Sequence, residues 1–140
     1  MINIDEIYDL FMWDSHYTPE EYGCREQRGL ELAKNIQYLY PFIQPILPNG
    51  KSKSIWEPCA IVIADRSDEE LVPYLPLLFE WLQDLNWPGA EIILDRLAKM
   101  PKALTEETLS CSKTEAENEH DEMWIEGLKE FESRQSEEKC

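Results

Sequence analysis

The segment from Leu71 to Leu97, LVPYLPLLFEWLQDLNWPGAEIILDRL, decides the fold of this chain. Its leucines recur at steps of three and four, which gives a helix one buried stripe. Pro88 then interrupts the pattern at a place that suits the first turn of a new helix, and a second apolar face follows it. The segment therefore predicts two antiparallel helices joined by a tight corner, where Asp84 or Asn86 caps the second helix.

Signals for helix starts and ends extend this reading along the chain. Three Ser/Thr-x-x-Glu capping boxes precede apolar-periodic runs, at Thr18–Glu21, Ser54–Glu57 and Ser67–Glu70. Pro73 and Pro76 should kink the helix that contains them, and Pro41 should end another. The run CAIVIA also suits a buried strand, but its capping box and flanks favour a helix. The patterns predict helices near residues 4–13, 18–40, 54–65, 68–84 and 87–100.

The run LFEWLQDLNWPGAEIILDRL resembles the hallmark of a family of small bacterial proteins, catalogued as a domain of unknown function with a HEAT-like helical fold. Upstream segments fit the same resemblance in order, so it covers roughly residues 7 to 98. The resemblance implies an all-α stack of antiparallel helical hairpins and no established activity. The corner departs from the general HEAT pattern, because Gly89 and Ala90 stand where Val-Arg would follow Asp84. This departure leaves open whether the Asp–Arg ladder of HEAT repeats forms in this chain.

The composition changes after Met100, and this change predicts the domain organisation. We expect a HEAT-like helical domain over residues 1–102 and an acidic linker over residues 103–121, which are polar and aperiodic. A C-terminal amphipathic helix and tail should occupy residues 122–140, since Trp124, Leu128 and Phe131 recur at steps of four and three. This helix either docks on the body or binds something else, and docking is favoured because a lone helix of its length is marginal in water.

The charge is the second informative property of the sequence. Twenty-nine acidic residues oppose thirteen basic ones, and the net charge is −16. Such a chain should be repelled by nucleic acid and by anionic lipid. Its charge either serves solubility alone, which is the usual role of solvated acids, or attracts a basic protein partner. No run of about 20 apolar residues predicts a membrane span. The four cysteines are far apart and the N-terminus lacks a basic signal region, so we expect reduced thiols and a cytoplasmic location.

Motifs for catalysis or metal binding are absent from the sequence. His16 and His120 are its two histidines, and the cysteines show no zinc-ligand spacing. Ser15 is next to His16 in the sequence, but adjacency does not establish the hydrogen-bond geometry of a catalytic pair. Neither a nucleophile elbow nor a glycine-rich phosphate loop occurs in the sequence. We therefore predict no catalytic residue, no cofactor and no metal. A catalytic site assembled from distant residues stays open, since sequence order does not exclude one.

Aromatic and acidic residues at the corners are the candidate partner-binding residues: Trp13, Asp14, Asp84 and Trp87. Three function hypotheses follow. The first is a non-enzymatic interaction module for a basic protein, with an immunity or regulatory protein as one concrete form by analogy. The second is an enzyme that acts on a nucleobase through a Trp/Asp-lined concave face, which the acidic charge disfavours. The third is a structural subunit of a larger complex. The oligomeric state is left open.

Overall fold

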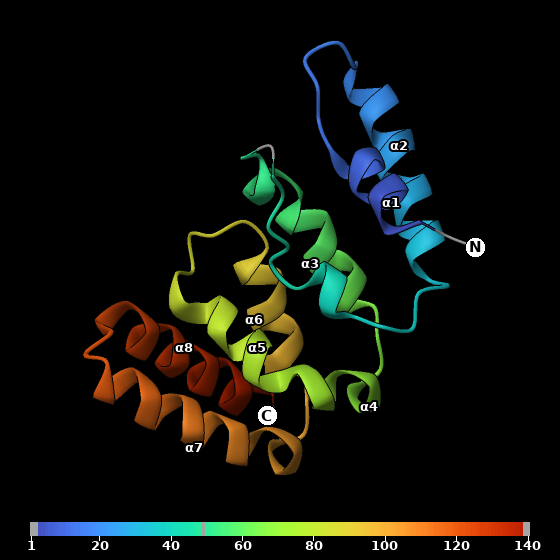
Figure 1. Cartoon of the computed structure of the whole chain (residues 1–140). Coiled ribbons are helices and arrows are strands. Elements are labelled where there is room, and N and C mark those ends of the chain that lie inside the picture. The colour runs from blue at the N-terminus through green and yellow to red at the C-terminus, as the bar shows by residue number, and fades with distance from the viewer. Residues whose placement is uncertain (1–2, 49, 139–140) are drawn as a thin grey trace.

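The computed structural model describes residues 3–48 and 50–138, and within these residues the chain forms helices and turns but no strand (Figure 1). The prediction of an all-α fold is confirmed. The α-helices are α1 (Ile4–Phe11), α2 (Pro19–Ala33), α3 (Trp56–Ala64), α4 (Asp68–Leu71), α5 (Leu75–Glu80), α6 (Ala90–Ala98), α7 (Lys102–Asn118) and α8 (Glu122–Glu138). The 3-10 turns are η1 (Tyr40–Phe42), η2 (Ser52–Ile55), η3 (Val72–Tyr74) and η4 (Trp81–Gln83). None of the described helices has the length and apolar character needed to cross a membrane.

The helices follow one another as a row of hairpins (Figure 1). The row runs from the blue α1–α2 hairpin to the orange and red α7–α8 hairpin. Helices α2, α3, α6 and α8 pack side by side in chain order, and we call them the second-helix layer. Helix α1 packs on α2, and α5 packs on α7. One continuous apolar core joins the row, from Ile7 in α1 to Phe131 in α8.

Two of the three expected capping boxes are present. Thr18 begins α2 and Ser67 begins α4, and in each the hydroxyl and the Glu three residues later satisfy each other's backbone N–H groups. The expected box at Ser54–Glu57 is wrong. The Ser54 hydroxyl donates to the Lys51 carbonyl, at 2.6 Å, so it stabilises the η2 turn instead of the start of α3.

Two long helices of the sequence prediction are shorter or broken in the structure. The helix expected over residues 18–40 ends at Ala33, because the Arg66 side chain binds the carbonyl groups of Ala33 and Ile36 where the chain turns away. The helix expected over residues 68–84 is interrupted by the 3-10 turn η3 around Pro73. This interruption confirms the predicted effect of the prolines, since proline lacks the N–H that continues an α-helix.

The acidic linker expected over residues 103–121 is wrong, because α7 occupies most of it. Thr105, Leu109, Ser112 and Ala116 are buried at steps of four, three and four, so they form one stripe along α7. Three of these four side chains are small or polar, and a search for large apolar residues therefore misses the stripe. Small side chains let α7 lie close against α5 and α8. No flexible linker separates α8 from the rest of the core.

The expected docking of the C-terminal helix is confirmed. Trp124, Leu128 and Phe131 are fully buried. The Trp124 indole N–H donates to the Phe79 carbonyl of α5 at 3.0 Å, and the Phe79 and Phe131 rings meet edge to face with centroids 5.0 Å apart. Gly127 permits this close approach, since a Cβ at that position would collide with the Leu82 carbonyl. Helix α8 is thus an integral part of the core.

The corner between η4 and α6 differs from the prediction in its capping. The Asp84 carboxylate accepts from the Asn86 N–H at 2.8 Å, so it caps the turn and not the helix. Gly89 precedes α6 in a left-handed conformation, with φ +84°, and no side chain caps the helix there. The corner is closed from within by Trp81, whose indole N–H donates to the Pro88 carbonyl at 3.1 Å.

Candidate functional site

The first pair of predicted partner-binding residues lies on the corner between α1 and α2. The Trp13 side chain is 59% exposed, and Asp14 is exposed beside it. Asp14 Oδ1 accepts from the His16 backbone N–H at 2.8 Å and lies 2.6 Å from His16 Nδ1. Hydrogen bonds from the backbone and side chain of His16 hold the pKa of Asp14 below its usual value. Asp14 thus shapes its own turn, and Trp13 is available to a partner.

The second pair lies on the corner before α6 and is integrated into the core. Asp84 caps that corner, and Trp87 is partly buried against Trp56 of the preceding hairpin. The two indole rings meet edge to face with centroids 5.8 Å apart. Lys53 Nζ lies 5.9 Å from both ring centroids, so a cation covers the exposed part of this aromatic pair. This corner therefore presents a lysine together with an aromatic ring.

Trp87→Ala should destabilise the fold, because it removes an aromatic ring that packs on Trp56. We expect a loss of about 1–3 kcal/mol in the free energy of unfolding, below the roughly 3–5 kcal/mol of a fully buried tryptophan. Urea denaturation of the variant measures the loss. Trp13→Ala is the matched control, and its midpoint should be almost unchanged because the ring is exposed. Equal midpoints for the two variants would refute the packing role of Trp87.

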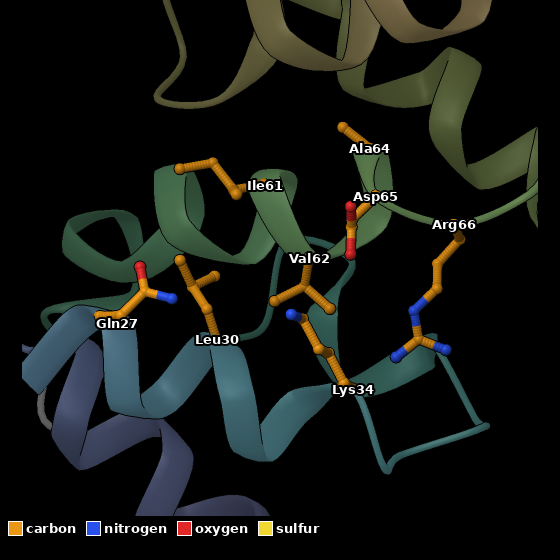
Figure 2. Close-up of a pocket in the computed structure, with 8 residues that line it drawn as sticks. All are labelled: Gln27, Leu30, Lys34, Ile61, Val62, Ala64, Asp65 and Arg66. Atoms are coloured by element: carbon orange, nitrogen blue, oxygen red, sulfur yellow. The ribbon is translucent and has the colours of Figure 1, made fainter.

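A pocket on the second-helix layer is a concave feature that the sequence did not indicate (Figure 2). It lies between α2 and α3 and has a volume of about 370 Å³. Figure 2 shows Leu30 and Val62 facing one another across the gap, while Lys34 and Asp65 point toward it from the two helices. The side chains that line the pocket are Gln27, Leu30, Lys34, Ile61, Val62, Ala64, Asp65 and Arg66.

The charged groups around this pocket differ in whether they already have partners. Arg66 Nη2 donates to the Ala33 and Ile36 carbonyls, at 2.7 Å each, and its Nη1 donates to Glu70 at 3.2 Å. Lys34 Nζ lies 3.6 Å from the Glu31 carboxylate. Within residues 3–48 and 50–138, no cation lies within ion-pair distance of the Asp65 carboxylate. Asp65 is therefore the unpaired charge of the pocket.

The arginine contact at the end of α2 has a counterpart at the end of α3. Arg96 Nε donates to the Ala64 carbonyl at 3.1 Å, and its Nη2 donates to the Arg66 carbonyl at 2.7 Å. Arg96 also pairs with Asp68 at 2.8 Å. Arg66 reaches a carbonyl 30 residues before it, and Arg96 does the same. We call these two contacts the arginine clamps, and each satisfies terminal carbonyls that the helix itself leaves unpaired.

Exposed carboxylates extend along the second-helix layer on both sides of the pocket. On α3, Glu57 and Asp65 are exposed two turns apart, and on α6 Glu91 and Asp95 are exposed one turn apart. Arg134 of α8 binds both Glu91 and Asp95, at 2.9 and 2.7 Å. Sequence reasoning assigned such acids to solvation. The signal that finds them is a spacing of eight residues at α3 and of four residues on α6, two consecutive second helices.

The chemistry for a metal or nucleobase site is not assembled at this pocket. Across the described residues, no three or more His, Cys, Asp or Glu side chains are placed to hold a metal ion. Trp81 and Trp124 are fully buried and donate to backbone carbonyls, and no tryptophan lines the pocket. Burial raises the pKa of the Cys59 thiol, which keeps it protonated at neutral pH. Cys24 and Cys111 are exposed free thiols, and Cys140 lies outside the described residues.

Comparison with known proteins identifies a family and no individual relative. Neither the curated proteins nor the solved structures contain a match to this chain. A family match covers residues 51–139, so it includes α7 and α8, beyond the range of 7 to 98 that the resemblance suggested, and it begins after α2. Because that match spans more than half of the chain, the protein belongs to the family described as Domain of unknown function (DUF5071).

Proposed function

We propose that this chain is a non-enzymatic interaction module that binds a basic protein through its second-helix layer. The observation that supports this proposal most directly is the exposed acidic surface of the layer. Its exposed carboxylates include Glu31, Glu57, Asp65, Glu91 and Asp95, of which Glu31 pairs with Lys34 and both Glu91 and Asp95 pair with Arg134. Charge of one sign on one face steers an oppositely charged partner toward that face and speeds association. The cytoplasm is the location that suits its unpaired thiols.

A HEAT-like arrangement is part of the proposal. Support comes from the order in which α2, α3, α6 and α8 pack, and from the arginine clamps, which link the end of α2 to the end of α3 and the end of α3 to α6. HEAT-like stacks present an extended surface made of consecutive helices, which suits the recognition of another protein. The corner residues Trp13 and Asp14 border the same stack and remain candidates for a peripheral contact.

Binding to a basic partner should weaken as ionic strength rises, and association should slow more than dissociation quickens. The experiment is affinity capture on the immobilised full chain from its native cell, followed by association kinetics of the recovered protein at low and high salt. A stoichiometric basic protein with salt-sensitive association supports the proposal. Association that is independent of salt contradicts it and indicates an apolar interface.

A pair of charge reversals separates the second-helix layer from the overall charge. Glu57→Lys changes the layer, and Glu107→Lys makes the same change of net charge on α7, outside the layer. Both residues are exposed, so both variants should fold. Slower association of Glu57→Lys alone supports the proposal, whereas equal slowing of both variants assigns the effect to net charge and contradicts it.

A further inference from the structure

We propose that the pocket between α2 and α3 receives one lysine or arginine side chain of the protein partner, with Asp65 as the group that binds its cation. This inference rests on the proposed function and names the contact that the second-helix layer makes. The pocket combines apolar walls with one unpaired carboxylate at its rim (Figure 2). A long basic side chain has the complementary form, since its methylene stem is apolar and its head is charged.

The walls of the pocket match the stem of such a side chain. Leu30 of α2 and Val62 of α3 face one another across the gap, and Ile61 also lines the pocket, although its side chain points away from α2 in Figure 2. The pocket has a volume of about 370 Å³, and Asp65 is an exposed residue of its lining. An entering stem would therefore remove apolar surface from water while its charged head stays at the rim.

The electrostatics of the rim favour a cation over an anion. Helices α2 and α3 both end beside the pocket, at Ala33 and Ala64, and the C-terminal end of a helix carries partial negative charge. The Arg66 guanidinium, the strongest cation nearby, already donates to two backbone carbonyls and to Glu70. The Arg66 guanidinium is thus held by the fold, whereas the exposed Asp65 carboxylate has no cation partner among the described residues.

Two cations of the pocket lining oppose an incoming cation, Arg66 and Lys34. Arg66 is held in place by two carbonyls and Glu70, whereas Lys34 is held less firmly. Its ammonium lies 3.6 Å from Glu31, and both side chains are more than half exposed. The pairing is therefore weak, and the lysine head is free to move away when a partner enters. Removal of this lysine should strengthen cation binding, while removal of the Asp65 charge should weaken it. These opposite expectations make the pocket testable before the partner is known.

The test uses the full chain and two short peptides as probes. The first is acetyl-Gly-Ser-Lys-Ser-Gly-amide, and the second carries norleucine in place of lysine, which keeps the stem and removes the charge. Nuclear magnetic resonance titration of the isotope-labelled protein locates binding by shifts of backbone amide signals. With the lysine peptide, we expect shifts centred on Leu30, Val62 and Asp65, and with the norleucine peptide much smaller ones.

Four variants decide the contribution of each charge. Asp65→Asn should raise the Kd for the lysine peptide about three- to tenfold, which corresponds to the loss of one partly exposed charge-assisted hydrogen bond. Lys34→Gln should lower that Kd about two- to threefold, consistent with a weak like-charge interaction in a solvated site. Glu107→Gln and Lys102→Gln make the same net charge changes on α7 and should leave the Kd unchanged.

The outcomes separate this inference from the proposed function. Equal binding by Asp65→Asn and Glu107→Gln, or shifts centred away from the pocket, would overturn the pocket assignment. The salt-sensitive capture of a basic protein would still stand in that case. Equal binding of the two peptides would overturn the requirement for a cation. Loss of the captured protein's salt sensitivity, with pocket binding of the lysine peptide intact, would instead count against the broader acidic surface.

Discussion

Trp124→Ala should destabilise the protein by about 3–5 kcal/mol, because it removes the largest side chain that joins α8 to the body. The ring is fully buried, and its N–H satisfies the Phe79 carbonyl of α5. The variant leaves a cavity and removes the indole hydrogen bond to this carbonyl. A domain of this size has about 5–15 kcal/mol of stability in total, so a large part of it is lost. Thermal and urea unfolding of the full chain measure the effect.

Met123→Ala is the control for this prediction, since Met123 is the neighbouring residue of α8 and is 54% exposed. Its unfolding midpoint should stay close to that of the unchanged protein. Trp124→Phe should fall between the two, because it keeps most of the apolar surface but loses the hydrogen bond to Phe79. A Trp124→Ala variant as stable as Met123→Ala would show that α8 is a peripheral helix.

Gly89→Ala should also destabilise strongly, by about 2–5 kcal/mol, because two effects act at one position. The residue has φ +84°, a left-handed conformation that costs a residue with a Cβ about 1–2 kcal/mol. The added Cβ would also lie 2.8 Å from the Cβ of Ala60 and 2.9 Å from the Trp56 carbonyl oxygen. Crowding of this kind in a packed interior costs about 1–3 kcal/mol. Chemical denaturation measures the sum.

Gly23→Ala is the opposite case and serves as the matched control. Gly23 lies inside α2, and a Cβ there would meet no atom within 4 Å. Alanine favours the helix over glycine by about 0.5–1 kcal/mol, so this variant should be slightly more stable. If the two glycine substitutions changed stability in the same direction and to a similar extent, the tight corner before α6 would not be a determinant of the fold.

Features that depend on nearby residues were predictable from the sequence. The boxes at Thr18 and Ser67 need only a hydroxyl and a glutamate three residues later, and both form as expected. The corner at Pro88 and the burial of Trp124 also follow from local periodicity. Ser54 has the same local pattern, yet its hydroxyl donates a hydrogen bond to the Lys51 carbonyl and does not cap α3. A capping motif competes with other nearby acceptors, and the sequence pattern does not record that competition.

Features that depend on distant residues were not predictable in the same way. Helix α7 is buried through Thr105, Ser112 and other small residues, whose role appears only when α5 and α8 are in place. The end of α2 is set by Arg66, about 30 residues away in the chain. Neither property gives a recognisable pattern of large apolar residues or an end signal in its own segment. The sequence therefore predicts a linker in place of α7 and a longer α2.

The candidate site shows the same division. Sequence reasoning placed the partner contacts at Trp13, Asp14, Asp84 and Trp87, because aromatic and acidic residues stand out at corners. The pocket instead combines Leu30 and Val62 from different hairpins, and its unpaired charge, Asp65, looks like an ordinary solvated acid in the sequence. Its lack of a cation partner becomes visible only when the positions of Lys34 and Arg66 are known.

In both arginine clamps, the end of an earlier helix is bound by an arginine that lies later in the chain. Arg66 completes the end of α2, and Arg96 completes the end of α3, so each helix relies on a donor supplied later in the chain. A segment that begins at residue 51 keeps both arginines, whereas a segment that ends before Arg66 leaves the carbonyls of α2 to water. The α1–α2 hairpin is thus an addition that later helices support and that supplies no capping arginine to them. The range 51–139 of the family match therefore contains Arg96 together with the carbonyls that it binds, whereas the carbonyls that Arg66 binds lie before that range.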